Sequence, residues 1–128
     1  MRIHVTIADS GVPWNLSLEQ FAQHMAAYRP DALIVMDTEN RDPQVRFEMT
    51  LGDEEVNGIY FTGTWQQLAC WDATIDAWAP VIEWFLSLLP LEADANVFLE
   101  AVAIPQPLPR LANAADIARI LTDLDNSI

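Results

Sequence analysis

The sequence predicts an α+β domain in which helices pack on a mixed or antiparallel sheet of about five strands. Some segments alternate apolar and polar residues as half-buried strands do, others space apolar residues three and four apart as one helix face does, and prolines or polar turn residues separate them. The expected order is β-α-β-β-β-α-β-α, with three helices. A sheet with helices mainly on one face leaves its other face for a partner. The 128 residues fit a single domain, residues 1–128.

The first part of the chain indicates a strand, a helix and a second strand. Residues 2–7 alternate between polar and apolar, which is typical of a half-buried strand. Ser17 is followed three residues later by Gln20, a pair typical of a capping box at a helix start. The helix should end before Pro30, because proline disfavours helical geometry in the residue that precedes it. Residues 32–36 are apolar on both faces, which predicts an interior strand.

The middle of the chain predicts a hairpin followed by a long, largely buried helix. Residues 45–51 alternate most clearly, residues 52–55 suit a hairpin turn, and the return strand is expected over residues 56–65. Apolar residues spaced four and three apart predict a helix over residues 71–89. Pro80 must lie near the start of that helix or mark a kink, because it has no N–H to donate.

The last third of the chain predicts a strand, a linker and a helix. Residues 96–104 are mostly apolar and are expected to form a strand. Pro105, Pro107 and Pro109 then predict an extended, unpaired linker. Asn113 should cap the final helix, whose apolar residues recur at helical spacing and form its inner face.

The charge balance excludes several classes of partner. The chain has 19 acidic and 6 basic side chains, so its net charge is −13, and every basic residue is an arginine. Direct binding of nucleic acid or of an anionic membrane surface is not expected, because both depend on basic side chains. The lack of lysine excludes lysine-dependent phosphate loops and Schiff-base chemistry.

The same sequence indicates a soluble, cytoplasmic protein. No apolar stretch reaches the ~18 residues of a membrane span, and the N-terminus lacks the apolar run of a signal peptide. The single cysteine, Cys70, cannot form an internal disulfide. The oligomeric state and the order of the strands in the sheet stay open at this level.

No catalytic motif is present, so enzyme activity is not expected. The two histidines, His4 and His24, do not form a metal-binding pattern. Residues 37–42 resemble a calcium loop superficially, but they lack its central glycine and its later bidentate glutamate. Cys70 is expected to be a buried apolar side chain rather than a nucleophile. We therefore expect neither a metal nor a cofactor.

Acidic side chains concentrate between residues 31 and 55, where eight carboxylates accompany only two arginines. Their field would speed encounter with a basic protein, although a solvated surface that only keeps the protein soluble is the alternative. Among the tryptophans, Trp78 and Trp84 are expected in the core, whereas Trp65 and Trp14 are candidate interface anchors. The predicted partner-binding residues are Asp37, Glu39, Asp42, Asp53, Glu54, Glu55 and Trp65.

Two segments resemble the small acidic immunity proteins encoded beside bacterial polymorphic toxins. They are residues 52–60 (GDEEVNGIY) and residues 71–90 (WDATIDAWAPVIEWFLSLLP). The resemblance implies a stoichiometric, non-catalytic inhibitor that occludes the active site of a cognate toxin. Many such toxins act on nucleic acids or nucleotides and carry basic clefts, so the implied partner is a basic toxin domain.

Two other functions stay open on the sequence alone. A small-molecule or carbohydrate-binding domain would use a tryptophan-lined pocket, and a deep pocket containing Trp65, Trp71 and a carboxylate would favour it. A mimic of nucleic acid would carry carboxylates spaced like phosphates on one face.

Overall fold

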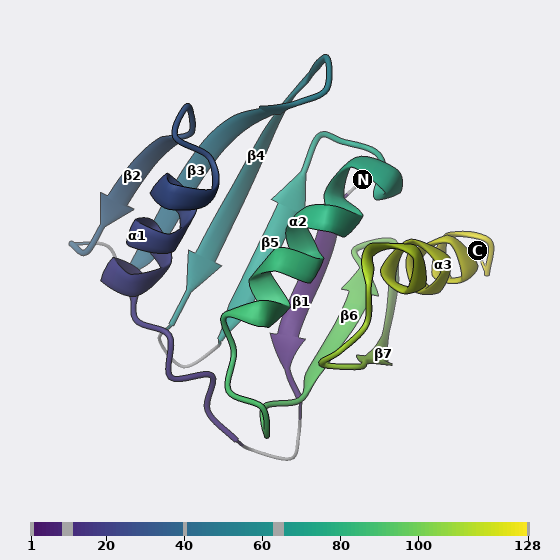
Figure 1. The fold of residues 1–128 in the computed structure, drawn as a ribbon. Helices are drawn as coiled ribbons and strands as arrows, with labels where there is room; N and C mark the ends of the chain where they lie inside the picture. Colours follow the sequence, from purple (N-terminus) through teal and green to yellow (C-terminus); the bar gives the residue numbers. More distant parts are fainter. Residues whose placement is uncertain (1, 9–11, 40, 63–65, 128) are drawn as a thin grey trace.

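The computed structural model describes residues 2–8, 12–39, 41–62 and 66–127. The chain forms one sheet of seven antiparallel strands, in the order β2-β3-β4-β5-β1-β6-β7, together with three helices (Figure 1). The α+β class is confirmed, and the sheet has seven strands where the sequence predicted about five. The strands are β1 Arg2–Ile7, β2 Leu33–Asp37, β3 Gln44–Leu51, β4 Glu54–Phe61, β5 Gln67–Trp71, β6 Ala95–Leu99 and β7 Val102–Leu108, and the helices are α1 Leu18–Tyr28, α2 Ile75–Ser87 and α3 Ala114–Asp125.

All three helices lie on the same face of the sheet (Figure 1). α1 packs over β2, β3 and β4, α3 packs over β6 and β7, and α2 lies between them in front of the central strands and contacts α3. The hydrophobic core therefore fills the space between this helical layer and one side of the sheet.

One additional strand arises where the sequence predicted a single return strand over residues 56–65 and a helix from residue 71. β4 ends at Phe61, and β5 runs through Trp71 between β4 and β1. The helix begins only at Ile75, where the Thr74 hydroxyl caps it by accepting a hydrogen bond from the backbone three residues on. The predicted end of the return strand and the predicted start of the helix are therefore both wrong. Trp71 fits the apolar spacing of a helix and of a strand, and the pairing of β5 with a strand on each side places it in a strand.

The other additional strand is β7. The sequence predicted that its first residues would continue a strand over residues 96–104 and that its last residues would belong to an unpaired proline linker. A turn at Glu100 and Ala101 ends β6, and β7 returns beside it with Pro107 opposite Asn96. The linker prediction is wrong because β7 is an edge strand. The outer N–H groups of an edge strand have no partner in the sheet, so proline is tolerated there.

The predicted helix caps are confirmed. The Ser17 hydroxyl accepts a hydrogen bond from the Gln20 N–H at 3.1 Å, and the Gln20 side chain accepts one from the Ser17 N–H at 2.9 Å. Asn113 and Asp116 form the same reciprocal pair at the start of α3. Pro80 lies in the second turn of α2 and is exposed, and because it has no N–H, the Asp76 carbonyl oxygen lacks its usual helical hydrogen bond.

Aromatic side chains occupy the centre of the core. Phe21 of α1 stacks on Tyr60 of β4 with ring centroids 4.6 Å apart, and the Tyr60 hydroxyl donates a hydrogen bond to the Leu16 carbonyl oxygen at 2.7 Å. Trp78 is fully buried, as predicted. Trp14 is also fully buried, and both its backbone N–H and its indole N–H donate hydrogen bonds within the fold. The expectation that Trp14 is an interface anchor is therefore wrong.

Gly58 on β4 lies where the ring of Phe47, on the neighbouring strand, crosses it. A Cβ atom at Gly58 would lie 2.1 Å from the Cζ atom of Phe47. The Phe47 ring is itself held between Phe21 and Trp78, with centroids 5.7 and 6.4 Å away. Only glycine fits at this position, because the Phe47 ring fills the space that a side chain would occupy.

Gly58→Ala should lower the free energy of unfolding by about 1–3 kcal/mol, because the Phe47 ring must leave its place in the core. Urea denaturation followed by far-UV circular dichroism measures the change. As a control, Thr50→Ala on the exposed side of β3 should cost less. Phe47→Leu should be less costly in the Gly58→Ala background than in the wild type, and a Gly58→Ala protein of wild-type stability would contradict the close approach.

Candidate functional site

The side of the sheet opposite the helices, which we call the open face, has no helix over it in the described part of the chain (Figure 1). Side chains alternate along a strand, so each strand that buries one set of residues presents the other set here. On β3, for example, Val45, Phe47 and Met49 are buried, whereas Arg46 and Glu48 are exposed. The register places on this face Arg2, His4, Leu33, Val35, Arg46, Glu48, Glu55, Asn57, Ile59, Phe61, Trp71 and Phe98.

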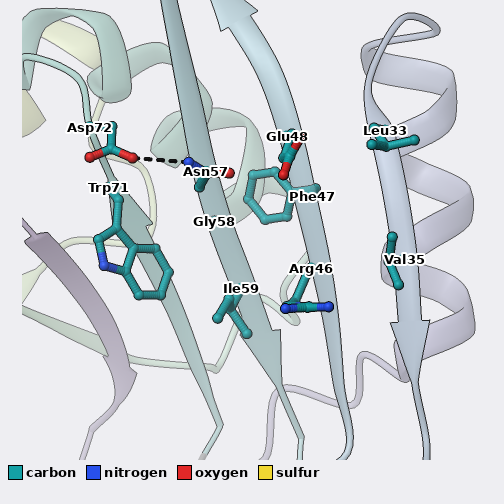
Figure 2. A pocket seen from close by; sticks show the side chains of 10 residues that line it. All are labelled: Leu33, Val35, Arg46, Phe47, Glu48, Asn57, Gly58, Ile59, Trp71 and Asp72. Carbon is teal, nitrogen blue, oxygen red and sulfur yellow. Dashed lines mark hydrogen bonds between the residues drawn. The ribbon is translucent and has the colours of Figure 1, made fainter.

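A hollow of about 380 Å³, the central hollow, lies on the open face between β2 and β5 (Figure 2). Leu33 and Val35 of β2 form one wall, and Trp71 of β5 forms the opposite wall. Polar side chains line it between these walls, and they carry charges of both signs. The lining residues are Leu33, Val35, Arg46, Phe47, Glu48, Asn57, Gly58, Ile59, Trp71 and Asp72.

Polar contacts hold the Trp71 side of the central hollow in place. Asp72 has a φ of 72°, in the left-handed region that aspartate tolerates, and its carboxylate accepts a hydrogen bond from the Asn57 side chain at 2.9 Å (Figure 2). The Arg2 guanidinium lies 4.4 Å from the centroid of the Trp71 ring and also pairs with Glu100 at 3.1 Å. One face of the indole is thus covered by a cation, and the wall is formed before any partner binds.

A second hollow, the acidic hollow, adjoins the first and has a volume of about 310 Å³. The two hollows share Leu33, Glu48 and Asn57, and the acidic hollow adds the carboxylates of Asp31 and Glu55. None of the described residues that line it is basic. This part of the open face is therefore suited to a guanidinium or ammonium group beside an apolar surface.

The structure divides the predicted partner-binding residues into two groups. Asp37 is the last residue of β2, opposite Gln44 on the open face, and Glu39 and Asp42 follow it in the β2–β3 connection; Asp53 lies in the turn of the β3–β4 hairpin, and Glu54 and Glu55 begin β4. These connections are at opposite ends of β3, whose eight residues span about 24 Å. Of the six carboxylates, Glu55 lines a hollow on the open face. Trp65 lies outside the described residues.

Sequence reasoning named Trp71 as a possible pocket residue but missed the apolar wall that β2 provides. Residues 32–36 were expected to form an interior strand, whereas β2 is an edge strand with Leu33 60% and Val35 44% exposed. Trp71 was assigned to a helix. The alternation over residues 45–51 was the one available signal, because it already places Arg46 and Glu48 on the side away from the core.

His4 is half-buried on the open face. Its ring stacks on Phe98 with centroids 4.7 Å apart, and its Nδ1 accepts a hydrogen bond from the Gln67 amide, a geometry that requires the neutral ring. Burial lowers the pKa of His4 from its ordinary value of 6.5; Glu100 opposes this effect and Arg2 adds to it. Burial and the contact with Gln67 therefore favour an uncharged histidine at this position.

The lowered pKa of His4 predicts a loss of stability in mild acid. The unfolded chain binds the proton more readily than the folded one, so the free energy of unfolding falls as the pH drops below about 6.5. Urea denaturation between about pH 7.5 and 5.5 should show a weaker pH dependence for His4→Gln than for the wild type. The exposed His24 provides the control, and His24→Gln should keep the wild-type profile. If the stability of His4→Gln depended on pH as steeply as that of the wild type, His4 would not be the source of the loss of stability in acid.

Cys70 is fully buried between β4 and β1, as expected, and burial raises the pKa of its thiol. A thiol in this state is a poor nucleophile. Within the described ranges, no three His, Cys, Asp or Glu side chains are grouped so as to hold a metal ion. The described helices include none that is long and apolar enough to cross a membrane.

No family model matches the chain, and no curated protein or solved structure is significantly similar to it.

Proposed function

We propose that this protein is a non-catalytic, protein-binding inhibitor of the immunity or antitoxin kind, which acts in the cytoplasm by occluding a basic site on a partner such as a toxin domain. One observation carries the proposal: the helices cover a single side of the sheet, and the uncovered side presents exposed apolar side chains beside carboxylates. Leu33 and Val35 are the clearest of these apolar side chains, and Glu48 and Glu55 are the neighbouring acids.

The two kinds of side chain support binding in different ways. A net charge of −13 attracts a basic surface from a distance and accelerates encounter. Apolar side chains such as Leu33, Val35 and Trp71 provide contact area that is removed from water once the partner is in place. The open face therefore combines long-range attraction with a short-range apolar surface.

The separation of the acidic groups suggests the shape of the partner's surface. The hairpin group (Asp53, Glu54 and Glu55) and the connection group (Asp37, Glu39 and Asp42) lie at the two ends of β3. A partner that used both would carry basic patches about 24 Å apart, with a less polar region between them. A cleft lined by arginine and lysine on both sides, which otherwise holds a phosphate-containing substrate, has this arrangement.

Reversing charge in the hairpin group should slow binding to a basic toxin domain, for which the product of the adjacent gene is the first candidate. Glu54→Lys with Glu55→Lys should reduce the association rate about tenfold at low salt and less at high salt, because steering depends on unscreened charge. Stopped-flow fluorescence measures the rate. Asp123→Lys with Asp125→Lys makes the same change in net charge on α3 and should have a smaller effect. Equal effects of the two pairs, or no effect of either, would contradict this site.

A small-molecule or carbohydrate-binding domain is the second candidate function. The central hollow, at about 380 Å³, is within the size range of ligand sites, and Trp71 lies there beside the polar side chains of Glu48, Asn57 and Asp72. An aromatic ring with an amide and carboxylates is a combination that can hold a sugar. The cover of Arg2 over one face of the Trp71 ring reduces the area left for stacking.

Titration with mono- and disaccharides separates the two functions. Protein binding through the open face predicts unchanged tryptophan emission at millimolar saccharide concentrations. Carbohydrate binding predicts a saturable change that Trp71→Phe removes and Trp84→Phe retains, because Trp84 stacks on Tyr28 away from the hollow. A saturable change of that kind would favour the second function over the first.

A further inference from the structure

We propose that the free edge of β2 accepts an extended strand of the partner by β-strand addition, and that this strand is apolar at its centre and basic at its ends. The inference rests on the proposed function and specifies how the partner is held. In strand addition, main-chain hydrogen bonds supply affinity, and the side chains on alternate positions supply specificity.

The two edges of the sheet differ in their ability to pair. β7 forms one edge and carries Pro105 and Pro107, which have no N–H and block the addition of a further strand. β2 forms the other edge and contains no proline. Among the described residues, β3 is the only strand that pairs with β2, so the outer side of β2 has no strand beside it.

The side chains of β2 are exposed on both faces of the sheet. Leu33 and Val35 are 60% and 44% exposed on the open face, and Met36 is 39% exposed on the helical side. A strand laid along β2 would place alternate side chains against each of these surfaces. Exposed apolar residues at an unprotected edge are a liability in a free monomer, which natural sheets usually avoid, so their presence here points to an occupant.

Charge at the ends of β2 specifies the chemistry of that occupant. Asp31 lies two residues before the strand and Glu39 two residues after it, and both are exposed. Glu48 lies opposite Leu33 on the open face, within reach of a long basic side chain from the next strand position. An added strand with arginine or lysine at its ends would meet carboxylates at each end and an apolar surface between them.

The same charges argue against a second copy of this chain as the occupant. If β2 paired antiparallel with β2 of another copy about Val35, Asp31 would lie opposite Glu39 at both ends of the new pairing. Like charges placed directly opposite are destabilising, and the net charge of −13 on each copy adds to the repulsion. A basic strand from a different protein has neither cost.

The test uses a capped heptapeptide of alternating valine and threonine with an arginine at each end. Titrated into the intact, ¹⁵N-labelled protein, it should shift the amide resonances of β2 and slow their hydrogen exchange. Val35→Lys should raise the dissociation constant at least tenfold. Ile104→Lys, which changes a 63% exposed apolar residue on β7 in the same way, should leave it unchanged. Circular dichroism confirms folding, and Leu33→Lys serves if Val35→Lys does not fold.

Several results would overturn the proposal. They are resonance shifts confined to β7 or the β3–β4 hairpin, no shift in β2 at saturating peptide, or equal affinity for a peptide ending in glutamate. A dimer in analytical ultracentrifugation that Val35→Lys dissociates would identify a second copy as the occupant instead.

Measurements with the product of the adjacent gene separate this inference from the proposed function. If the Glu54→Lys, Glu55→Lys pair weakens binding and Val35→Lys does not, inhibition by surface contact stands and strand addition is wrong. If the heptapeptide binds at β2 and the product of the adjacent gene does not bind at all, strand addition stands and inhibition of that gene product is wrong.

Discussion

Burial of one side of the sheet beneath three helices is the constraint on which the rest of the structure depends. An antiparallel sheet can satisfy it with alternation, because each strand needs apolar residues at every second position only. The residues at the positions in between do not pack in the core, so they need not be apolar. Their composition therefore reflects solubility or binding, and exposed apolar residues such as Leu33 and Val35 carry information that core residues do not.

Charge and apolar surface are distributed differently over this molecule. The acidic side chains between residues 31 and 55 occur mainly at both ends of β3 and around the acidic hollow, whereas Val35, Ile59 and Trp71 line the central hollow alone. Arg46 lines the central hollow together with Glu48 and Asp72, whereas the described lining of the acidic hollow contains carboxylates and no basic side chain, so a basic side chain of a partner is favoured in the acidic hollow. Long-range attraction would bring a basic protein to this side of the sheet, and the apolar centre would determine which orientation excludes water.

The two edge strands of the sheet, β2 and β7, differ in whether their sequence blocks pairing with a further strand. Prolines protect β7, and a single aspartate ends the otherwise apolar β2. Net charge of one sign opposes self-association, which permits an exposed apolar edge without aggregation. Pairing of β2 with a foreign strand would extend the sheet and bury that edge, in keeping with an inhibitor whose stable state is the complex.

Local sequence patterns were sufficient for the elements whose signals depend on neighbouring residues. The alternation over residues 45–51, the Ser17 capping box and the Asn113 cap were all predicted, because period and capping are properties of a few consecutive residues. The candidate site was predictable only in part. Its acidic residues were visible as a cluster in the chain, but their division between the two ends of β3 was not.

Tertiary pairing determined what the local patterns left ambiguous. Trp71 fits the period of a helix and of a strand, and it became a wall of the central hollow only because β5 pairs between β4 and β1. Residues 32–36 are apolar on both faces, and this pattern does not distinguish a central strand from an edge strand. The order of strands in a sheet depends on contacts between residues far apart in the chain, and no local period encodes that order.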